Sequence, residues 1–333
     1  MQGGVRILSA LLGVIAGCSS SPVWTIDYSD DHNWYLAAAP LGDQLLIAGG
    51  QPGTPGGQPG RGQLLLRGAD SAADYRVLAS PQPGMLWWVH AAAGGAWLCG
   101  ENGSILRFDP TAGGTLSAVP TGSRATLYGI WAFSDEDVWA VGGESGGVGV
   151  VLHGGRGGFV VDSTVPSAST LYKLWASDPE HLFVVGQDGT LLRRIRQAAG
   201  FVWIRDTSPV RDRLLTAWGT AADAVFAVGG LGTARLLRFD GQVWQTDAAV
   251  AGLSGLSGLH IDGELLLITG QSGLIASRPA GSAAGTALRS VEPLTELDLH
   301  GAVSALGARW AVGGNLSQYP VQPARGIVLR QGR

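Results

Sequence analysis

The sequence predicts an all-β protein: a seven-bladed β-propeller with four antiparallel strands in each blade. Three observations carry this prediction. An apolar run that ends in glycine recurs seven times, glycine makes up 53 of the 333 residues, and no long stretch has helical periodicity. Glycine at about twice its usual share favours many tight turns and opposes long helices.

The recurring apolar run marks the second strand of each predicted blade. Its glycines are separated by 51, 42, 44, 43, 41 and 43 residues along the chain. A period of this length, with several short strands in each unit, is typical of propeller blades. The seven runs are 45–49, 96–100, 138–142, 182–186, 225–229, 266–270 and 310–313.

The other strands of a blade keep step with this run. In the first strand, Trp131, Trp175 and Trp218 each lie 11 residues before the repeat glycine. After the glycine, turns such as Asn102-Gly103 supply the positive φ angles of a type I′ hairpin. Third strands are expected at 104–108, 190–194, 236–239 and 274–277. An aromatic or large apolar residue marks the fourth strand: Tyr75, Leu116, Phe159, Trp203, Trp244 and Leu288.

The two ends of the chain are expected to complete one blade together. The seventh repeat stops after its third strand at 327–330, and Trp24 lies 25 residues before Gly49, as a fourth-strand residue should. We therefore expect residues 22–27 to close the ring, which removes an exposed sheet edge. Deleting this strand should destabilise the whole domain. Rings of six or eight blades are the alternatives.

The first 17 residues have the form of a secretory signal. Arg6 precedes an apolar stretch, 7–17, that is too short to span a bilayer. The end of this stretch, Ile15-Ala16-Gly17-Cys18, resembles the bacterial lipobox, and this resemblance implies that Cys18 becomes the lipidated N-terminus. An ordinary cleaved signal is the alternative.

The expected organisation is a signal peptide at 1–17, a lipid-anchored tether at 18–21 and the propeller at 22–333. Ser19 and Ser20 follow the cysteine. By resemblance to Gram-negative lipoproteins, the absence of aspartate there implies export to the outer membrane. The lipid on Cys18 is the only attached group that we expect, and no cofactor or metal is predicted.

The repeat also carries a family resemblance. The pattern Trp-x6-Val-Trp-Ala-Val-Gly at 131–142 and the Gly-x-x-Trp at 241–244 resemble propeller repeats of secreted proteins from gliding and social bacteria. Glycine doublets such as Gly142-Gly143 are similar to those of kelch repeats, although the kelch Tyr and Trp spacing is absent. The WD dipeptide of WD40 repeats is absent too. This resemblance implies a fold and not an activity.

Composition and motifs argue against several functions. The net charge is −4 and Lys173 is the only lysine, so a nucleic-acid partner is not expected. The chain has no HExxH, CxxC or GxSxG motif, and no sialidase Asp box. We therefore predict no catalytic residues and favour a protein that is not an enzyme.

Two sets of polar residues remain open to a metal. His90 and His260 lie one position after that of Trp131 on the inner strand, where they could line the channel and bind a metal or simply pack. A series of aspartates precedes the second strands and fits either calcium ligands or turn capping, the more ordinary role. The series is Asp135, Asp137, Asp178 and Asp223.

Long loops predict where a partner would bind. The turns at 50–63 and 314–325 belong to blades 1 and 7, which are neighbours in a closed ring, and the connection 27–33 should emerge on the same face. A Gly/Pro-rich insertion without consequence is the alternative. The candidate residues of this rim are Asp30, Asp31, His32, Arg61, Asn315, Gln318, Tyr319 and Arg325.

These features favour a lipid-anchored scaffold at the cell envelope that binds a protein or an extracellular glycan. The rival interpretation is a secreted carbohydrate-active hydrolase or lyase with its site over the central channel. Clustered carboxylates at the channel mouth would favour the rival. A structural envelope component without a separate ligand is the third possibility.

Overall fold

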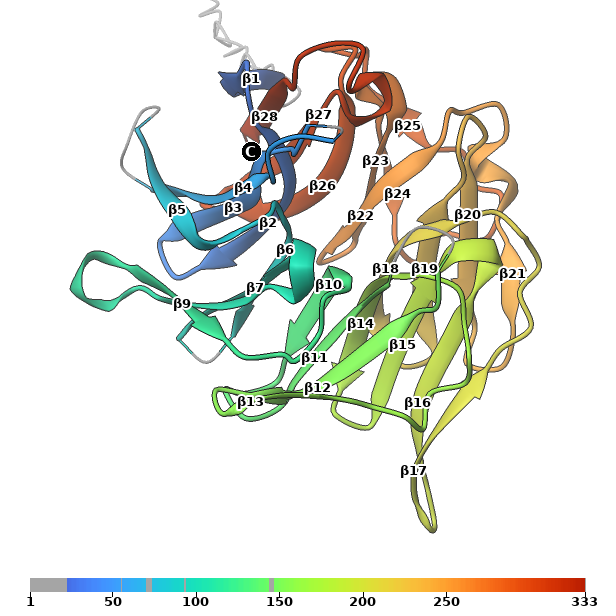
Figure 1. Cartoon of the computed structure of the whole chain (residues 1–333). Helices are drawn as coiled ribbons and strands as arrows, with labels where there is room; N and C mark the ends of the chain where they lie inside the picture. The colour runs from blue at the N-terminus through green and yellow to red at the C-terminus, as the bar shows by residue number, and fades with distance from the viewer. Residues whose placement is uncertain (1–22, 55, 70–73, 93, 144–146, 333) are drawn as a thin grey trace, which may run out of the picture.

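The fold is a closed ring of β-sheets. The computed structural model describes residues 23–54, 56–69, 74–92, 94–143 and 147–332. These residues form seven four-stranded sheets around a central axis (Figure 1). The first strands of neighbouring blades contact one another in turn, and the seventh contacts the first. The predicted seven-bladed, all-β propeller is therefore confirmed.

Blades 1 to 3 follow the repeat from the N-terminal side, and each runs from its inner to its outer strand. Blade 1 contains β2 (Trp34–Leu41), β3 (Gln44–Gln51), β4 (Arg61–Gly68) and β5 (Tyr75–Pro83). Blade 2 contains β6 (Leu86–Ala92), β7 (Gly95–Gly100), β8 (Ile105–Asp109) and β9 (Thr115–Val119). Blade 3 contains β10 (Thr126–Ala132), β11 (Val138–Gly143), β12 (Val150–Gly155) and β13 (Gly158–Val161).

Blades 4 to 6 repeat the same order. Blade 4 contains β14 (Leu171–Asp178), β15 (His181–Gly186), β16 (Leu191–Gln197) and β17 (Gly200–Arg205). Blade 5 contains β18 (Leu214–Ala221), β19 (Ala224–Gly229), β20 (Arg235–Phe239) and β21 (Trp244–Thr246). Blade 6 contains β22 (Leu256–Asp262), β23 (Leu265–Gly270), β24 (Ile275–Pro279) and β25 (Arg289–Ser290).

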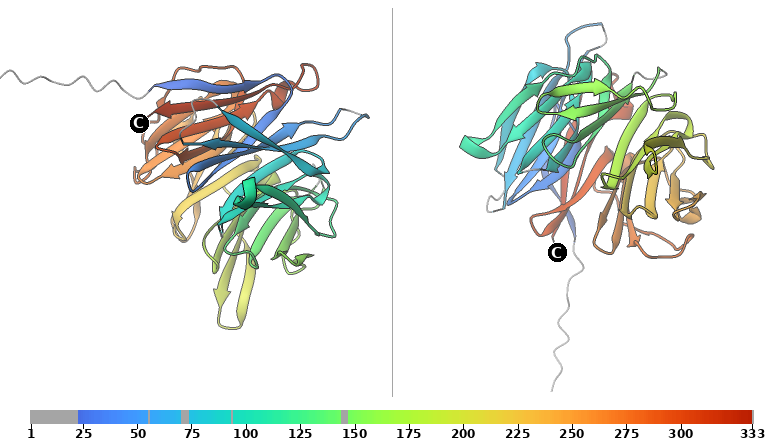
Figure 2. Two further views of the ribbon diagram at one scale, coloured as in Figure 1. Left: turned by 90° about the vertical axis from the view of Figure 1, so that its left-hand side faces the viewer. Right: turned by 90° about the horizontal axis from the view of Figure 1, so that it is seen from below.

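Blade 7 combines both ends of the chain. It contains β26 (Asp298–Ala305), β27 (Ala308–Gly314), β28 (Gly326–Gly332) and, as its outer strand, β1 (Trp24–Asp30). In antiparallel register, Trp24 faces Gln331 and Asp30 faces Gly326, and β1 lies alongside β28 in Figure 2. The closing strand therefore exists, but it runs from 24 to 30. The predicted connection 27–33 begins only after Asp30.

The turn after the repeat glycine adopts the predicted positive φ angles. Asn102 and Gly103 have φ of 58° and 69°, and Asp188 and Ser272 occupy the same conformation in blades 4 and 6. These turns form short 3₁₀ segments. Within the described residues the 3₁₀ segments are η1 (Glu101–Gly103), η2 (Thr111–Gly113), η3 (Gln187–Gly189), η4 (Ala248–Val250), η5 (Gln271–Gly273) and η6 (Leu316–Gln318).

The repeat glycines are required where the second strand passes the start of the first. A Cβ atom on Gly142 would overlap the carbonyl oxygen of Thr126, and one on Gly313 would overlap that of Asp298. The other five repeat glycines meet the equivalent carbonyl of their own blade. Any side chain would separate these strands, so the spacing of the glycines reports the spacing of the blades.

Candidate functional site

Every inner strand contains a β-bulge at the same place. In blade 3, Leu127 pairs with Gly142 and Gly129 pairs with Val141, so Tyr128 is left out of the ladder. A bulge turns the extra residue away from the sheet. The seven bulged residues are Leu36, Trp87, Tyr128, Tyr172, Leu215, Ser257 and His300.

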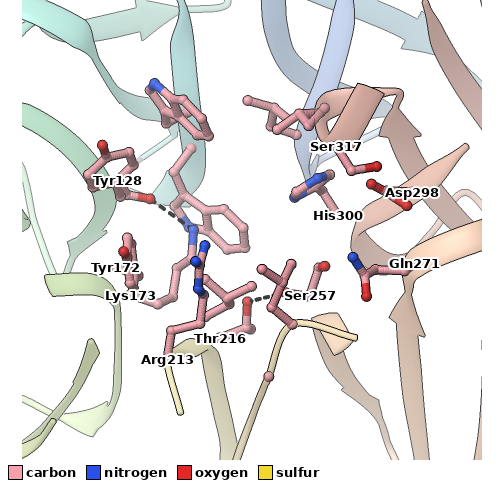
Figure 3. A pocket seen from close by; sticks show the side chains of 17 residues that line it. Tyr128, Tyr172, Lys173, Arg213, Thr216, Ser257, Gln271, Asp298, His300 and Ser317 are labelled. Carbon is pink, nitrogen blue, oxygen red and sulfur yellow. Dashed lines mark hydrogen bonds between the residues drawn. The ribbon is translucent and has the colours of Figure 1, made fainter. Parts of the chain in front are cut away.

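All seven bulged residues line one cavity at the mouth of the central channel. Its volume is about 340 Å³. The segment η6 borders the mouth through Leu316 and Ser317, so the long loop of blade 7 lies on the same face (Figure 3). The side chains that complete the wall include Trp88, Lys173, Arg213, Thr216, Gln271 and Asp298.

An aromatic row covers one part of the mouth. Trp87 packs edge-to-face on Tyr128 with ring centroids 5.0 Å apart, and Tyr128 packs on Tyr172 at 5.4 Å. The hydroxyl of Tyr172 donates to Oε1 of Gln187 at 2.8 Å, which fixes its ring. Since blades 2, 3 and 4 each contribute one ring, the row exists only in the assembled propeller.

Lys173 is the most unusual residue of the mouth. Its Nζ donates to the carbonyl oxygen of Tyr128 at 2.8 Å and lies 3.4 Å from the centroid of the Trp88 ring. Burial lowers the pKa of Lys173 to about 7, against a smaller opposing effect of the Cys99 thiol. The amine therefore changes its charge near neutral pH.

The opposite wall is polar and mostly neutral. Asp298 accepts a hydrogen bond from the backbone N–H of Ser272 at 3.1 Å. Burial lowers the pKa of His300 to about 4, so its imidazole is uncharged at neutral pH. Oε1 of Gln271 accepts from the backbone N–H groups of Gly232 and Gly255, both at 3.0 Å.

Below the mouth, aromatic side chains pack into the channel. The ring of Trp131 lies 6.4 Å from that of Trp175 and 5.8 Å from that of Trp218. Trp131 and Trp218 come from blades 3 and 5, which are not neighbours, so these rings meet across the channel. We call Trp131, Trp175, Trp218 and the two histidines that contact them, His90 and His260, the aromatic plug.

The structure places both predicted channel histidines in the plug. The ring of His90 lies 4.1 Å from that of Trp131, and the ring of His260 lies 5.1 Å from that of Trp218. The expected position was wrong by one residue: His90 pairs with Trp97 as Trp131 pairs with Trp139. The reason is that Trp97 lies seven residues after His90, whereas Trp139 lies eight residues after Trp131, so counting back from the repeat glycine misplaces His90 by one.

The aspartates near the turns bind partners within the chain. Asp135 accepts from Nε of Arg107 at 2.7 Å and Asp137 from the indole of Trp139 at 2.9 Å. Asp178 accepts from the backbone N–H of Glu180 at 2.8 Å. Within the described part of the chain, no group of three or more His, Cys, Asp or Glu side chains is placed to hold a metal ion.

The structure brings part of the predicted rim together. Asp30, Asp31, Gln318 and Arg325 line one crevice of about 440 Å³ beside blade 7. Tyr319 reaches the loop of blade 1, where its hydroxyl donates to the carbonyl of Gly53 at 2.7 Å. The loops of blades 1 and 7 are therefore in contact, as the ring closure required.

Several rim residues have clear structural partners. Asp30 accepts hydrogen bonds from the backbone N–H of His32 and from the hydroxyl of Tyr35. Asn315 is 1 % exposed, and its Oδ1 accepts from the indole of Trp34 at 3.0 Å. Arg61 lies at the start of β4. The hydrogen bonds of Asp30 and Asn315 therefore fix the shape of the rim.

The remaining N-terminal predictions fall on residues that the structure does not describe. Cys18, the signal peptide and the tether at 18–21 all lie outside the described residues. None of the described helices is both long enough and apolar enough to cross a bilayer.

Comparisons with known proteins find a solved structure with a similar fold. No known protein family matches the sequence, and no curated protein matches it. Among solved structures, the chain is similar to "YCF48 bound to D1 peptide", with a TM-score of 0.63 and 13 % sequence identity. The match covers 94 % of this chain and 95 % of that one. At this identity the similarity shows the propeller fold.

Sequence reasoning placed the partner site on the rim and considered a site over the channel only for the rival enzyme, so none of the residues that line the mouth was predicted as a site residue. Repeat counting treats each inner strand as a regular ladder and does not reveal the bulges. One signal was present. Lys173, the only lysine, occupies the place that Gly129, Gly258 and Gly301 hold in blades 3, 6 and 7.

Proposed function

We propose that this chain is a non-catalytic binding scaffold, held at the cell envelope by a lipid on Cys18, that binds a protein partner at the channel mouth. The observation that carries the proposal is the cavity of about 340 Å³ on the propeller axis. Rings of Trp87, Tyr128 and Tyr172 line it beside two cationic side chains. Concave sites with aromatic walls and few polar groups are typical binding sites.

Exposed apolar side chains on the same face support a protein partner. Val148, Leu231 and Val321 lie on second-to-third strand loops and are 74 %, 62 % and 92 % exposed. Leu294, 44 % exposed, lies on the connection into β26. Both kinds of connection emerge on the side of the mouth, and Leu231 lines the cavity itself. Exposed apolar side chains also occur on outer strands, as at Val77, Val160 and Phe201, so Leu231 at the cavity wall is the one that bears on a partner at the mouth.

The solved structure that this chain resembles supports a peptide as the bound group. That structure is of YCF48 bound to a D1 peptide, so a propeller with nearly full-length similarity holds a peptide. The carbohydrate-active alternative needs two carboxylates that face one another. Asp298 is the one carboxylate among the described residues that line the mouth. The mouth therefore favours binding over hydrolysis.

The direction of β1 fits an anchor that leaves the mouth free. β28 starts at Gly326 on the mouth side, and β1 is antiparallel to it, so Trp24 lies on the opposite side. Cys18 is six residues before Trp24. A lipid on Cys18 would thus hold the propeller with its mouth turned away from the bilayer. Cys18→Ser is then expected to release the protein from membranes, which fractionation with acyl labelling measures.

Site-specific photocrosslinking in the native envelope tests the binding proposal. A photoreactive amino acid at Ser317, exposed at the mouth, is expected to capture one protein partner in stoichiometric yield. The matched control is the same group at Glu264, exposed in the turn on the opposite side. Capture from position 264 alone would contradict binding at the mouth. Recovery of glycan in place of protein would favour the carbohydrate-binding alternative.

A further inference from the structure

The channel mouth contains two cationic side chains without a carboxylate partner. Among the described residues, eight arginines form ion pairs with Asp or Glu. Lys173 and Arg213 form none, like ten other described arginines, but these two alone among the unpaired cations line the cavity. In a chain with a net charge of −4, this is a local excess of positive charge.

The position of Lys173 makes this excess costly. Lys173 is 8 % exposed, and its ammonium has three hydrogens to donate. It contacts the carbonyl oxygen of Tyr128 and the face of the Trp88 ring. A buried charge without a counter-ion is unfavourable. An incoming anion would therefore bind Lys173 more tightly than it would bind an exposed lysine.

The two walls of the cavity differ in charge. Figure 3 shows Lys173 and Arg213 entering from one side, and Asp298, His300 and Gln271 from the other. Asp298 already accepts a hydrogen bond from the backbone of Ser272. An anionic group of a ligand is therefore directed to the Lys173 and Arg213 side and away from Asp298.

One neutral donor of the mouth is open to a ligand. Gln271 uses its Oε1 to accept from two backbone N–H groups, which leaves its Nε2 to donate. A donor of this kind suits a carbonyl oxygen of a peptide.

We propose that the channel mouth takes the carboxylate side chain of an acidic residue, Asp or Glu, presented by the protein partner. The carboxylate would lie between Lys173 and Arg213, and the aromatic row would pack on the adjoining peptide. This inference rests on the proposed function.

The shape of the mouth favours a peptide over an acidic sugar. The rings of Trp87, Tyr128 and Tyr172 pack edge-to-face at 74° and 63°, so they form no continuous flat platform for a sugar ring. The volume is near the small end of the range of about 300–1,000 Å³ for ligand sites. It suits one side chain and its backbone.

The single lysine provides a direct measurement. Protein labelled with ¹⁵N-lysine gives one Nζ signal, which is followed by NMR while blocked tripeptides Ala-Glu-Ala and Ala-Gln-Ala are added. The glutamate peptide is expected to shift the Lys173 signal and to bind at least ~10-fold more tightly than the glutamine peptide. Equal binding of the two peptides would overturn the inference.

The affinity for the glutamate peptide should depend on pH in one direction. The free amine titrates at a pKa of about 7, and a bound carboxylate raises this value. Affinity is therefore expected to be constant from pH 6 to pH 7, where the peptide's carboxylate stays ionised, and to fall up to ~10-fold for each unit above pH 7. An affinity that stays constant from pH 6 to pH 9 would contradict a role for Lys173.

Two variants and one control locate the site. Lys173→Met and Arg213→Gln are each expected to abolish the preference for glutamate. Arg289→Gln removes the same charge from the exposed outer strand β25 and should retain it. If Lys173→Met does not fold, Arg213→Gln carries the test. Binding of glucuronate, but of neither peptide, would overturn the inference in favour of an acidic glycan.

The proposed function and this inference can fail separately. If the partner is still captured from position 317 when both cations are replaced, the scaffold stands and the acidic contact is wrong. If the wild-type protein captures no partner, the proposed function itself is wrong. The peptide titrations do not depend on the identity of the partner.

Discussion

At the scale of single residues, partly buried histidines make the stability of the fold sensitive to acid. Burial lowers the pKa values of His90 and His260 to about 4, and His300 shares this value at the mouth. Nε2 of His260 accepts a hydrogen bond from the backbone N–H of Ser304 at 3.3 Å, which requires that nitrogen to be unprotonated. The aromatic plug is thus built for neutral imidazoles.

The free energy of unfolding should therefore decrease as pH falls from about 6.5 to about 4. In this window the unfolded chain binds a proton at each histidine and the folded chain does not. Urea denaturation from pH 7.5 to pH 4 measures the slope, which His90→Gln and His260→Gln should each reduce. The control His32→Gln changes an exposed side chain. An unchanged slope in both plug variants would contradict this account.

At the scale of the elements, a buried ion pair joins blades 5 and 6. Asp247, which follows β21, pairs with Arg278 of β24, and their side chains are 0 % and 1 % exposed. Asp247 also accepts from the backbone N–H of Gly285 at 2.8 Å. Burial opposes ionisation, but the bonds from Arg278 and the backbone outweigh it and lower the pKa of Asp247.

Asp247→Asn is expected to lower the free energy of unfolding by ~3–5 kcal/mol, because it leaves Arg278 buried without a counter-ion. The matched control is Glu180→Gln, which breaks the exposed pair with Arg196 and should cost less than ~1 kcal/mol. Urea denaturation measures both. Equal, small effects would show that the buried pair does not stabilise the contact between these blades.

At the scale of the whole molecule, β1 determines whether the ring is closed. Trp24 is 3 % exposed and packs with Leu267 of blade 6 and Leu329 of blade 7. One strand of seven residues therefore supports two blades. Without it, β28 would become an open edge.

Trp24→Ala is expected to destabilise the whole propeller by ~3–5 kcal/mol, the usual cost of emptying a buried tryptophan site. Deletion of residues 22–27 should lower the melting temperature further. Val23→Ala, at a side chain that is 70 % exposed, is the control. Amide hydrogen exchange shows which blades lose protection in the Trp24→Ala variant. Loss of protection confined to blade 7 would show that the ring does not unfold as one unit.

The sequence by itself determined the blade count and the ring closure. Glycine is required at Gly142 and its six equivalents, because a Cβ atom there would overlap a carbonyl oxygen of the same blade. The repeat can therefore be recognised from the sequence alone. Turns such as Asn102-Gly103 are equally local, because positive φ angles select these residues. The pairing of Trp24 with the C-terminal strand followed from counting, since a blade needs four strands.

The tertiary structure alone decided the site. Each bulge turns Tyr128, Tyr172 or His300 toward the axis, but a bulge is one extra residue in a ladder and leaves no repeat in the sequence. The place of Lys173 depends on Tyr128 and Trp88, which come from two other blades. Only closure of the ring brings these residues together. The burial that follows lowers the pKa of the Lys173 amine.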